Sequence, residues 1–511
     1  MKSIYIINPR SDFPTYYGAE VFAASGLPNR TLIADLATVT LAALVPDGLR
    51  VELCDENLSP IRYDADVDFV AITGKITQSA SMKRIASQFR DRGRTVLIGG
   101  PYASLSPREL RPYCDILVRG EIEGISQELF GDLMADSWKD EYRGGRPDLT
   151  LCPRPAWGLY PNSAALLGAV QTSRGCPFEC EFCDVIQYLG RKQRHKPVAQ
   201  VLAELDQVYG HGYRHIFLAD DNFTVHRSRA KELLVAIRDW QTRKGKALTL
   251  YTQVSIDAAR DEELLRMCAE AGLTSVFIGI ETPNEDSLRE SRKRQNLNIE
   301  LLNEIGRFLE HGIAVSGGMI VGFDSDGLDI FETQYRFAMA SPIPIFSLGA
   351  LVAPEATPLH ARMKEAGRLV GGSEVAASPW STNISPLQMS RRQLIAGLRD
   401  LCERLYHPSA FARRVLHFAQ GFRPRIRQGA HACPAEDLSS HDPQVWRLLG
   451  RLSARGPEEA LMWSKVKKVL ADNREARRLV ISMLMQYAQI LYMYEAAGLR
   501  GTTAIEGSSV G

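Results

Sequence analysis

Short apolar runs alternate with helix-like segments over the first 350 residues of this 511-residue chain. The first runs cover residues 4–7, 50–54, 69–73, 95–99 and 116–119. A second series covers residues 169–173, 215–219, 248–254, 275–280, 314–321 and 345–352, with helical segments at 197–209, 227–242, 262–271 and 297–311. Strands that alternate with helices form a parallel sheet with helices packed on it. The sequence therefore predicts an α/β protein with two such units in series.

Changes in composition indicate the domain boundaries. We expect a Rossmann-like domain at residues 1–140 and a linker at 141–167, where Gly, Pro and Asp are frequent. The second α/β unit then occupies residues 168–370. Residues 371–511 are expected to form a helical domain, with helical apolar spacing at 393–406, 457–470 and 474–497.

Charge and hydropathy exclude several classes of protein. The formal net charge is only +1, so there is no electrostatic reason to expect nucleic-acid binding. The N-terminal apolar run is too short for the core of a signal peptide. The most apolar stretch, residues 479–494, is shorter than the ~20 residues of a transmembrane helix. We therefore expect a cytoplasmic protein in reducing surroundings, with no transmembrane segment.

Three cysteines, Cys176, Cys180 and Cys183, follow the first strand of the second unit with the spacing C-x3-C-x2-C. Three thiolates this close together favour an iron–sulfur cluster or zinc. A structural zinc site usually needs a second pair of Cys or His ligands, which does not lie nearby, and a disulfide would leave one thiol unpaired. The other cysteines are scattered and are expected to be small buried residues: Cys54, Cys114, Cys152, Cys268, Cys402 and Cys433.

The cysteine spacing, with the aromatic Phe182 just before the third cysteine, resembles the signature of the radical SAM superfamily. The resemblance implies a [4Fe-4S] cluster held by the three cysteines, with S-adenosylmethionine chelated to the fourth iron. It implies that the reduced cluster cleaves S-adenosylmethionine to a 5′-deoxyadenosyl radical, with an electron donor such as flavodoxin or ferredoxin. Residues 168–370 would form the partial (β/α)6 barrel of that family. Zinc, or inert buried cysteines, is the alternative.

Polar residues and glycines stand at the ends of the barrel strands, where barrel chemistry belongs. By the resemblance, these residues would bind S-adenosylmethionine. The candidates are Asp220, Asp221, Gln253, Ser255, Gly279, Glu281, Ile320, Val321 and Gly322, and in the basic run before the first helix Arg194. For one of the two aspartates, the alternative is an N-cap of the helix that begins near Arg227.

Three loops of the first domain resemble the cobalamin-binding domain that precedes many radical SAM domains. Glycines in such loops permit close approach of the backbone to a large ligand. The candidate cobalamin contacts are Thr73, Gly74, Lys75, Ile76, Gln78, Gly99, Gly100, Tyr102, Gly120 and Glu121, with Lys75 and Ile76 nearest the lower face of cobalt. All ten histidines lie at His195 or later, so this domain has no histidine ligand for cobalt. A vestigial domain without cobalamin is the alternative.

The order of these segments, with the Asp220-Asp-Asn-Phe223 strand end and the helical tail, resembles B12-binding radical SAM proteins that carry a C-terminal domain of unknown function. Hopanoid and bacteriochlorophyll side-chain methylases are related to this subgroup. The resemblance implies a C-methyltransferase acting on a small-molecule or lipid-like substrate. The alternatives are a radical cyclase, rearrangement or coupling enzyme, and an iron–sulfur scaffold or redox sensor. Tyr16, Tyr17 and residues 352–357 are candidates to line the substrate cavity, and no acid or base can be assigned to the substrate step.

Overall fold

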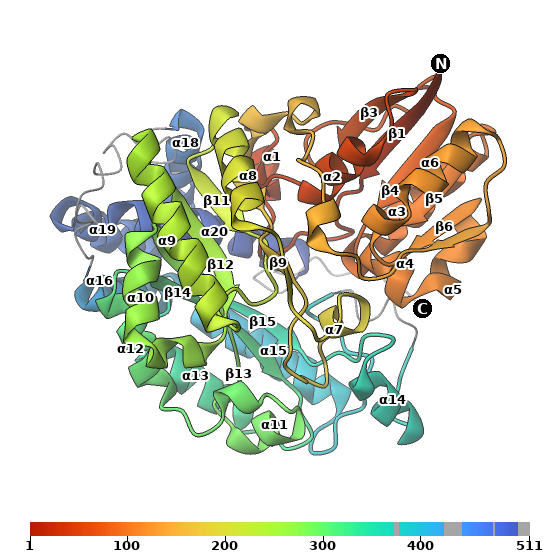
Figure 1. The fold of residues 1–511 in the computed structure, drawn as a ribbon. Helices are drawn as coiled ribbons and strands as arrows, with labels where there is room; N and C mark the ends of the chain where they lie inside the picture. The colour runs from red at the N-terminus through yellow and green to blue at the C-terminus, as the bar shows by residue number, and fades with distance from the viewer. Residues whose placement is uncertain (372–377, 424–441, 474–475, 499–511) are drawn as a thin grey trace.

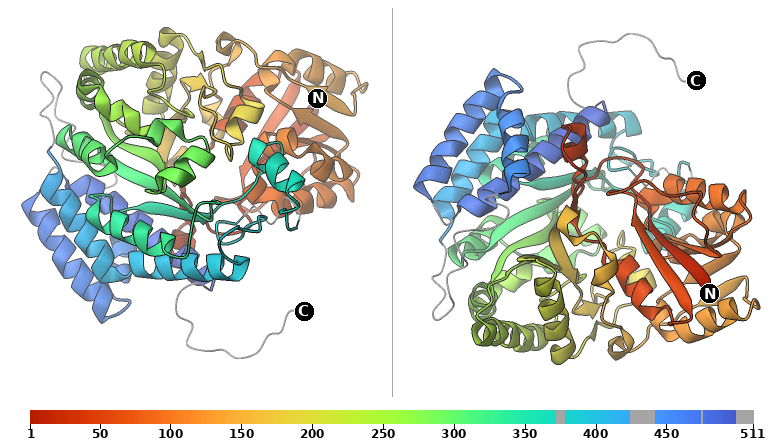
Figure 2. Two further views of the ribbon diagram at one scale, coloured as in Figure 1. Left: turned by 90° about the horizontal axis from the view of Figure 1, so that it is seen from below. Right: turned by 90° about the horizontal axis from the view of Figure 1, so that it is seen from above.

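Two parallel sheets and a layer of C-terminal helices make up the protein (Figure 1). The computed structural model describes residues 1–371, 378–423, 442–473 and 476–498. The N-terminal sheet lies to one side of the second, curved sheet, and the C-terminal helices pack against another side of it (Figure 2). Cys433 lies outside the described residues.

The N-terminal sheet has six strands in the order β3-β1-β4-β5-β6-β7, all parallel. Its strands are β1 (Lys2–Asn8), β3 (Leu49–Asp55), β4 (Phe69–Thr73), β5 (Thr95–Gly99), β6 (Ile116–Arg119) and β7 (Glu141–Arg143). The helices around it are α2 (Leu36–Leu44), α3 (Ser79–Arg90), α4 (Pro101–Leu105), α5 (Pro107–Leu110) and α6 (Ser126–Met134). Separate apolar clusters cover its two faces, as a parallel sheet requires.

The second sheet has seven strands in the order β15-β14-β13-β12-β11-β8-β2 and forms the predicted partial barrel. Its strands are β2 (Thr31–Ile33), β8 (Ala165–Val170), β11 (His215–Leu218), β12 (Thr249–Val254), β13 (Leu273–Glu281), β14 (Ala314–Val321) and β15 (Phe346–Ala350). The helices along it include α8 (Val198–Gly210), α9 (Arg227–Lys244), α10 (Glu262–Glu270), α12 (Leu301–Glu310) and α13 (Ile330–Ala340). The predicted α/β fold is confirmed.

Two strands cross the predicted domain boundaries. β2 comes from the first 140 residues but pairs with β8 at the edge of the barrel sheet. β7 lies in the predicted linker and extends the N-terminal sheet through its pairing with β6. Both strands are only three residues long and β7 is mostly charged, so neither has an apolar run long enough to be recognised from the sequence.

The C-terminal region is helical, as the sequence predicts. It contains α15 (Arg391–Leu405), α16 (Pro408–Gly421), α18 (Pro443–Ser453), α19 (Pro457–Asp472) and α20 (Arg477–Ala496), while α14 (Pro358–Glu365) precedes it at the end of the barrel domain. α15 packs on β15, and α20 packs on α18 and on the short N-terminal helix α1 (Glu20–Ala24). An N-terminal and a C-terminal segment, α1 and α20, therefore lie side by side next to the barrel, as the dark red and blue helices in Figure 2 show.

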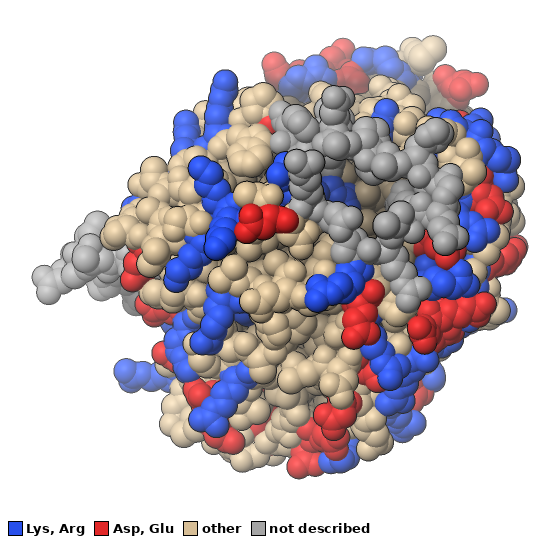
Figure 3. Space-filling model, turned by 90° about the vertical axis from the view of Figure 1, so that its left-hand side faces the viewer, with Lys and Arg blue, Asp and Glu red and all other residues tan. Residues whose placement is uncertain are grey.

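The surface carries no strong charge bias on the face seen in Figure 3, where basic and acidic side chains are interspersed. This agrees with the net charge of +1. Within the described parts of the chain, no helix is long and apolar enough to cross a membrane.

Candidate cofactor site

The two faces of the barrel sheet are covered differently. Along β11 and β12, Leu218 and Leu250 are fully buried, whereas Phe217 and Tyr251 stay partly exposed. Phe217 lies opposite Tyr251 in the strand register, so these two rings share a face. Neighbouring strands place further partly exposed residues on it: Gln253, Ser275, Phe277, Gly279, Ser316, Ile320, Ser347 and Gly349. This inner face is the part of the barrel that is open to ligands.

The cysteine loop follows β8 and the short strand β9 (Ser173–Arg174). Cys180 is buried, and Cys176 and Cys183 are partly buried. The N–H of Cys183 donates to the carbonyl of Cys180 at 3.1 Å, so these two residues share one turn. Burial raises the pKa of the Cys183 thiol to about 12 and also raises the pKa of Cys176. Such thiols become thiolates when a bound metal stabilises the charge.

Two polar side chains that follow β13 reach the cysteines. Gln295 Nε2 donates to the sulfur of Cys180 over 3.5 Å. Burial alone would lower the pKa of Lys293, but Glu281 and the nearby thiols of Cys180 and Cys183 raise it. Among the described residues, no group of three or more His, Cys, Asp or Glu side chains is placed to hold a single metal ion. Three thiols flanked by an ammonium and an amide donor fit an iron–sulfur cluster, whose potential depends on such neighbours.

An ion-pair network holds the outer side of the cysteine loop. Glu181 is buried and pairs with Arg362 of α14 at 2.5 Å, and Arg362 also pairs with Asp324 at 2.6 Å. The backbone of Glu181 accepts from the N–H of Leu359 at 3.1 Å and donates to the carbonyl of Ser291 at 2.9 Å. The loop is therefore fixed to two other segments of the barrel domain.

Asp220 and Asp221, at the end of β11, bind the backbone that leads into the cysteine loop. The buried Asp220 accepts from the N–H groups of residues 172 and 173 at 2.7 and 2.9 Å. Asp221 accepts from the N–H of Gly175 at 2.8 Å, and burial raises its pKa to about 6. The alternative prediction of an N-cap is wrong, because α9 begins after His226, whose side chain makes no capping bond. Contact of either carboxylate with S-adenosylmethionine stays a prediction.

Gln253 and Ser255 follow one another at the end of β12. Ser255 Oγ accepts from Asn222 Nδ2 at 3.1 Å, which joins this strand end to the previous one. Gln253 is held by its backbone carbonyl, which accepts from the N–H of Phe223 at 2.9 Å. Its side-chain amide, on the inner face, forms no hydrogen bond with the described residues and is available to a ligand.

Gly279 and Glu281 lie at the end of β13. Glu281 has a φ of +61°, and its carboxylate pairs with Lys293 at 2.6 Å. A Cβ on Gly279 would collide with this pair. The sequence predicts that Gly279 makes room for adenosine; in the structure, the first group that needs this room is the Glu281–Lys293 pair.

Residues Ile320, Val321 and Gly322 end β14. Val321 is buried, while Ile320 is partly exposed on the inner face. Gly322 has a φ of +103°, and its N–H donates to Asp326 at 2.9 Å, which fixes the turn. Gln334 Nε2 donates to the carbonyl of Ile320 at 2.6 Å. The backbone of this strand end is therefore rigid, as an adenine platform requires, and its role stays a prediction.

The loops after β4 and β5 touch one another. Gly100 has a φ of +92°, and a Cβ there would lie 2.7 Å from Thr73 Oγ1. The N–H of Tyr102 donates to the carbonyl of Gly74 at 3.2 Å. Gly99 ends β5, next to Thr73 in the strand register. Five of the predicted cobalamin contacts thus lie together at the carboxyl edge of the sheet, where α/β proteins bind ligands, with Thr73, Gly99 and Gly100 partly exposed and Gly74 and Tyr102 buried beneath them.

The remaining residues of these loops differ in exposure. Lys75 is exposed and Ile76 partly exposed, so both side chains can reach a ligand. Gln78 is buried and its Oε1 accepts from the N–H of Lys75 at 2.7 Å, so it supports the loop. Gly120 follows β6 and donates through its N–H to Ser104 Oγ at 2.9 Å.

The N-terminal loops approach the cysteine loop. Burial raises the pKa of Asp184, directly after the third cysteine, and the charge of Lys75 opposes this rise. α4 also contacts α7 (Val185–Tyr188), the helix that follows Asp184. The two predicted cofactor surfaces therefore lie near each other in space.

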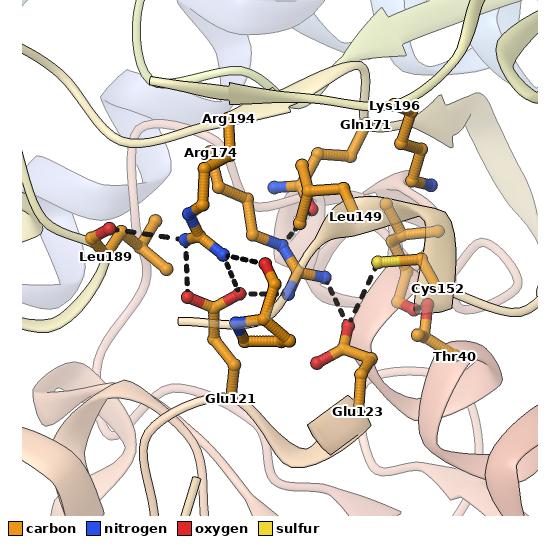
Figure 4. Close-up of polar contacts among 12 residues, drawn as sticks. Thr40, Glu121, Glu123, Leu149, Cys152, Gln171, Arg174, Leu189, Arg194 and Lys196 are labelled. Carbon is orange, nitrogen blue, oxygen red and sulfur yellow. Dashed lines mark hydrogen bonds and ion pairs between the residues drawn. The ribbon is translucent and has the colours of Figure 1, made fainter. Parts of the chain in front are cut away.

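Two arginines and two glutamates join the domains (Figure 4). Arg194 donates to both carboxylate oxygens of Glu121, at 2.5 and 2.9 Å. Arg174 donates to Glu121 at 2.7 Å and to Glu123 at 2.6 Å. Cys152 Sγ donates to Glu123 over 3.3 Å. We call Glu121, Glu123, Arg174 and Arg194 the interdomain clamp.

The interdomain clamp engages two residues that the sequence assigns to cofactors. No side chain of the clamp is more than 13% exposed, so Arg194 and Glu121 act on one another here. Their contact with a cofactor stays a prediction. Sequence reasoning did not find Glu123 and Arg174. The available signal was a pair of acidic residues two positions apart after β6. These residues lie near the cysteine motif in the folded protein but far from it in the sequence.

Tyr16 and Tyr17 lie beside the barrel, as expected for residues near a substrate. The Tyr17 ring meets Phe277 of the inner face at 6.0 Å, and Ser347 Oγ donates to its hydroxyl at 3.4 Å. Tyr17 nevertheless keeps 38% of its surface exposed. Tyr16 donates to the carbonyl of Leu348 on β15 at 2.9 Å. Residues 352–357 connect β15 to α14.

Known proteins share this arrangement. The family model described as the radical SAM superfamily matches residues 170–338, and the domain of unknown function DUF4070 matches residues 357–498. The chain is 30% identical over 472 residues to the hopanoid C-2 methylase of Rhodopseudomonas palustris (strain TIE-1), covering 90% of this chain and 88% of the relative. The chain belongs to the radical SAM superfamily. It is an enzyme of the same family as that methylase. The resemblance to radical SAM proteins with a C-terminal domain of unknown function is confirmed.

Two solved structures share the fold. TsrM from Kitasatospora setae, described as a radical S-adenosylmethionine methyltransferase with cobalamin and a [4Fe-4S] cluster bound, superposes with a TM-score of 0.59. It is 16% identical, and the match covers 93% of this chain and all of TsrM. OxsB, described as a cobalamin-dependent S-adenosylmethionine radical enzyme, gives a TM-score of 0.62 at 14% identity, over 98% of this chain and 80% of OxsB. Family membership makes a [4Fe-4S] cluster and S-adenosylmethionine the cofactors of this radical SAM enzyme.

Proposed function

We propose that this radical SAM enzyme is a cobalamin-dependent C-methyltransferase that acts on an unactivated carbon of an apolar small molecule. The observation that carries the proposal is the meeting of two loop surfaces. The cysteine loop and the glycine-rich loops of the N-terminal sheet approach each other at Asp184 and Lys75. The resemblance to a methylase over 88% of that relative's length supports the same reaction class.

The residues present fit the proposed cofactors. Cys176, Cys180 and Cys183 would hold the cluster, and the inner-face residues at the ends of β12 to β14 would hold S-adenosylmethionine. The backbones of Thr73, Gly74 and Gly100 pack closely, and a corrin ring can lie on the two of them that are partly exposed, Thr73 and Gly100. When bound, the cluster with S-adenosylmethionine would supply a 5′-deoxyadenosyl radical able to take a hydrogen atom from a carbon, and cobalamin would supply a methyl group.

The protein's own contribution is to hold, orient and shield. Lys293 holds a positive charge beside the cysteine sulfurs, and Glu281 fixes its position. The interdomain clamp sets the spacing between the two loop surfaces with short, buried ion pairs, which are worth most where water is excluded. Lys75 is exposed and close enough to Asp184 for its positive charge to lower the pKa of that carboxyl against the effect of burial.

The inner face of the barrel favours an apolar substrate. Phe217, Tyr251 and Phe277 lie on it, and Tyr17 adds a fourth ring from the N-terminal segment. The phenol of Tyr17 is neutral at physiological pH even at its ordinary pKa, and desolvation at the barrel face raises that pKa to about 12, although part of the ring stays exposed. Neutral aromatic walls bind lipid-like molecules by burying apolar surface.

The reaction class can be tested with anaerobically reconstituted protein supplied with cobalamin, S-adenosylmethionine, a reductant and an extract of apolar metabolites. We expect both 5′-deoxyadenosine and S-adenosylhomocysteine, detected by mass spectrometry, with a methyl label passing from S-adenosylmethionine to product. Formation of deoxyadenosine without S-adenosylhomocysteine or labelled product would replace methyl transfer by a cyclisation, rearrangement or coupling. Protein that is free of corrin after growth with cobalamin would indicate a vestigial domain.

The cluster must be reduced before it can act, so the proposal includes a low-potential donor such as flavodoxin or ferredoxin, in the cytoplasm. All described cysteines are free thiols, which suits such reducing surroundings.

A further inference from the structure

A cavity of about 460 Å³ opens in the part of the chain that matches the domain of unknown function, away from the inner face of the barrel. Its volume is within the range of small-molecule sites. Six of the residues that line it are Trp380, Arg391, Arg392, Ile395, Ala396 and Arg399. Five of these belong to α15, at positions i, i+1, i+4, i+5 and i+8 of one helix face.

The arginines of this cavity have few partners. Arg392 and Arg399 are exposed, and neither forms an ion pair or hydrogen bond with a described residue. Arg391 donates from Nη2 to the carbonyl of Thr382 at 2.7 Å, while its Nε is buried without a hydrogen-bond partner. Asp400, next to Arg399, pairs with Arg404 at 3.4 Å. Three positive charges thus surround the cavity without a described acidic side chain to balance them.

The position of two arginines on α15 opposes the usual rule for helices. Ser390 caps the helix, so Arg391 and Arg392 stand in its first turn, where there is no acidic residue. The N-terminus of a helix carries partial positive charge, and cations are unfavourable there. A sequence that breaks a local rule without gain in the fold points to a function. An anion in the cavity would balance both the arginines and the helix dipole.

The rest of the cavity lining is mainly apolar, with Ser381 and Thr382 as its polar members. Ile395 and Ala396 line it from α15, and the indole of Trp380 faces them from the preceding segment. An edge contact of Trp380 with Tyr494 at 5.0 Å and a tilted contact with Tyr16 at 6.2 Å hold the indole in place. The cavity therefore has arginines at both ends of the α15 face, Arg391 and Arg392 at one and Arg399 two turns further on, with Ile395 and Ala396 between them and Trp380 beside them.

We propose that this cavity binds an amphipathic anion, with a carboxylate or phosphate on Arg391, Arg392 and Arg399 and its apolar part on Trp380 and Ile395. Guanidinium groups bind both kinds of head group through paired hydrogen bonds. The proposal assigns a ligand to the C-terminal domain and does not depend on methyl transfer.

Isothermal titration of the full-length protein tests the proposal, with dodecanoate and dodecyl phosphate below their micelle concentrations as probes. Dodecyl maltoside provides the same tail with a neutral head, and inorganic phosphate provides a head without a tail. We expect dodecanoate or dodecyl phosphate to bind with a stoichiometry of one molecule per chain and more tightly than either control. The anion with the higher affinity then shows whether the site prefers a carboxylate or a phosphate. Arg392→Gln/Arg399→Gln should weaken that binding by roughly tenfold to a hundredfold, and Trp380→Leu should weaken it less.

Arg447→Gln is the matched control, because Arg447 is an exposed arginine of α18 outside the cavity. It should leave the affinity unchanged. Removal of a cation from the first turn of α15 should leave the thermal midpoint of Arg392→Gln/Arg399→Gln equal to or above that of the wild type, which excludes unfolding as the cause. Equal binding of dodecyl maltoside, equal weakening by Arg447→Gln, or no binding of either anion would overturn the proposal. Because no S-adenosylmethionine is present, each of these results leaves the proposed methyl transfer unaffected.

Discussion

The N-terminal sheet and the barrel sheet are both parallel, but the first is buried on both faces and the second on only one. In β1 of the N-terminal sheet, Ile6 and Ile7 point to opposite faces and both are fully buried. In β11 of the barrel sheet, Leu218 is fully buried and its neighbour Phe217 is not. A sheet that is packed on both faces can bind ligands only at its edges. A curved sheet that is packed on one face offers a whole surface.

The largest expected effect is on the open side of the barrel, at the cysteine loop. Cys180→Ala should reduce the iron content of reconstituted protein from about four per chain to background, because three thiolates are the minimum for the proposed cluster. Iron analysis and visible absorption measure this. Cys268→Ala is the control, since Cys268 is buried in α10 and should leave the iron content unchanged. An unchanged cluster in Cys180→Ala would contradict the assignment.

The next largest effect is expected on the stability of the protein, from a change in the interdomain clamp. Arg174→Gln leaves the carboxylate of Glu123 buried without its cation, and it should lower the free energy of unfolding by about 3–5 kcal/mol. Urea unfolding measures the change. Arg191 pairs with Glu179 on the surface, so Arg191→Gln should cost less than about 1 kcal/mol. Similar losses in the two variants would mean that the interdomain clamp does not hold the domains together.

The burial contrast itself can be tested with two adjacent pairs. Ile6→Ala and Ile7→Ala should each lower the free energy of unfolding by about 2–5 kcal/mol, because both leave cavities. Leu218→Ala should do the same, whereas Phe217→Ala should cost only about 1 kcal/mol, because the ring is partly exposed. Chemical denaturation of the four variants checks this. If Phe217→Ala is as costly as Leu218→Ala, the inner face is packed and the contrast fails.

The smallest expected effect is on the pH dependence of stability, through His195 next to the interdomain clamp. Burial lowers the pKa of His195, beside Arg194, from 6.5 to about 4 in the folded protein. The unfolded chain therefore binds more protons between these values, so stability is complete above about pH 6.5 and falls as the pH decreases toward 4. Because the ring is half-buried, we expect a loss of about 1–2 kcal/mol. Unfolding of His195→Gln at pH 7 and pH 4.5 should show a smaller pH dependence, whereas His226→Gln should keep most of it.

The strands of both sheets can be predicted from the sequence because a buried strand is a short continuous run of apolar residues. Continuous apolar runs such as residues 69–73 and 95–99 coincide with β4 and β5. The strand β2 has no such run. Its three residues form a strand only because they pair with β8, which is more than a hundred residues away in the chain. The N-cap prediction for Asp220 and Asp221 was wrong for a related reason: both carboxylates bond to residues 172–175, which are distant in sequence.

By itself, the sequence determined the chemistry available to this protein: three cysteines at a spacing suited to a cluster, glycines at strand ends and two α/β units. Spacing and periodicity are local properties, so they can be read along the chain. Only the tertiary structure decided which charges meet. It placed Arg174 and Arg194 against Glu121 and Glu123, and Lys293 beside Glu281 and the cysteines. Electrostatic energy depends on distance in space and on burial, and neither is written in the order of the residues.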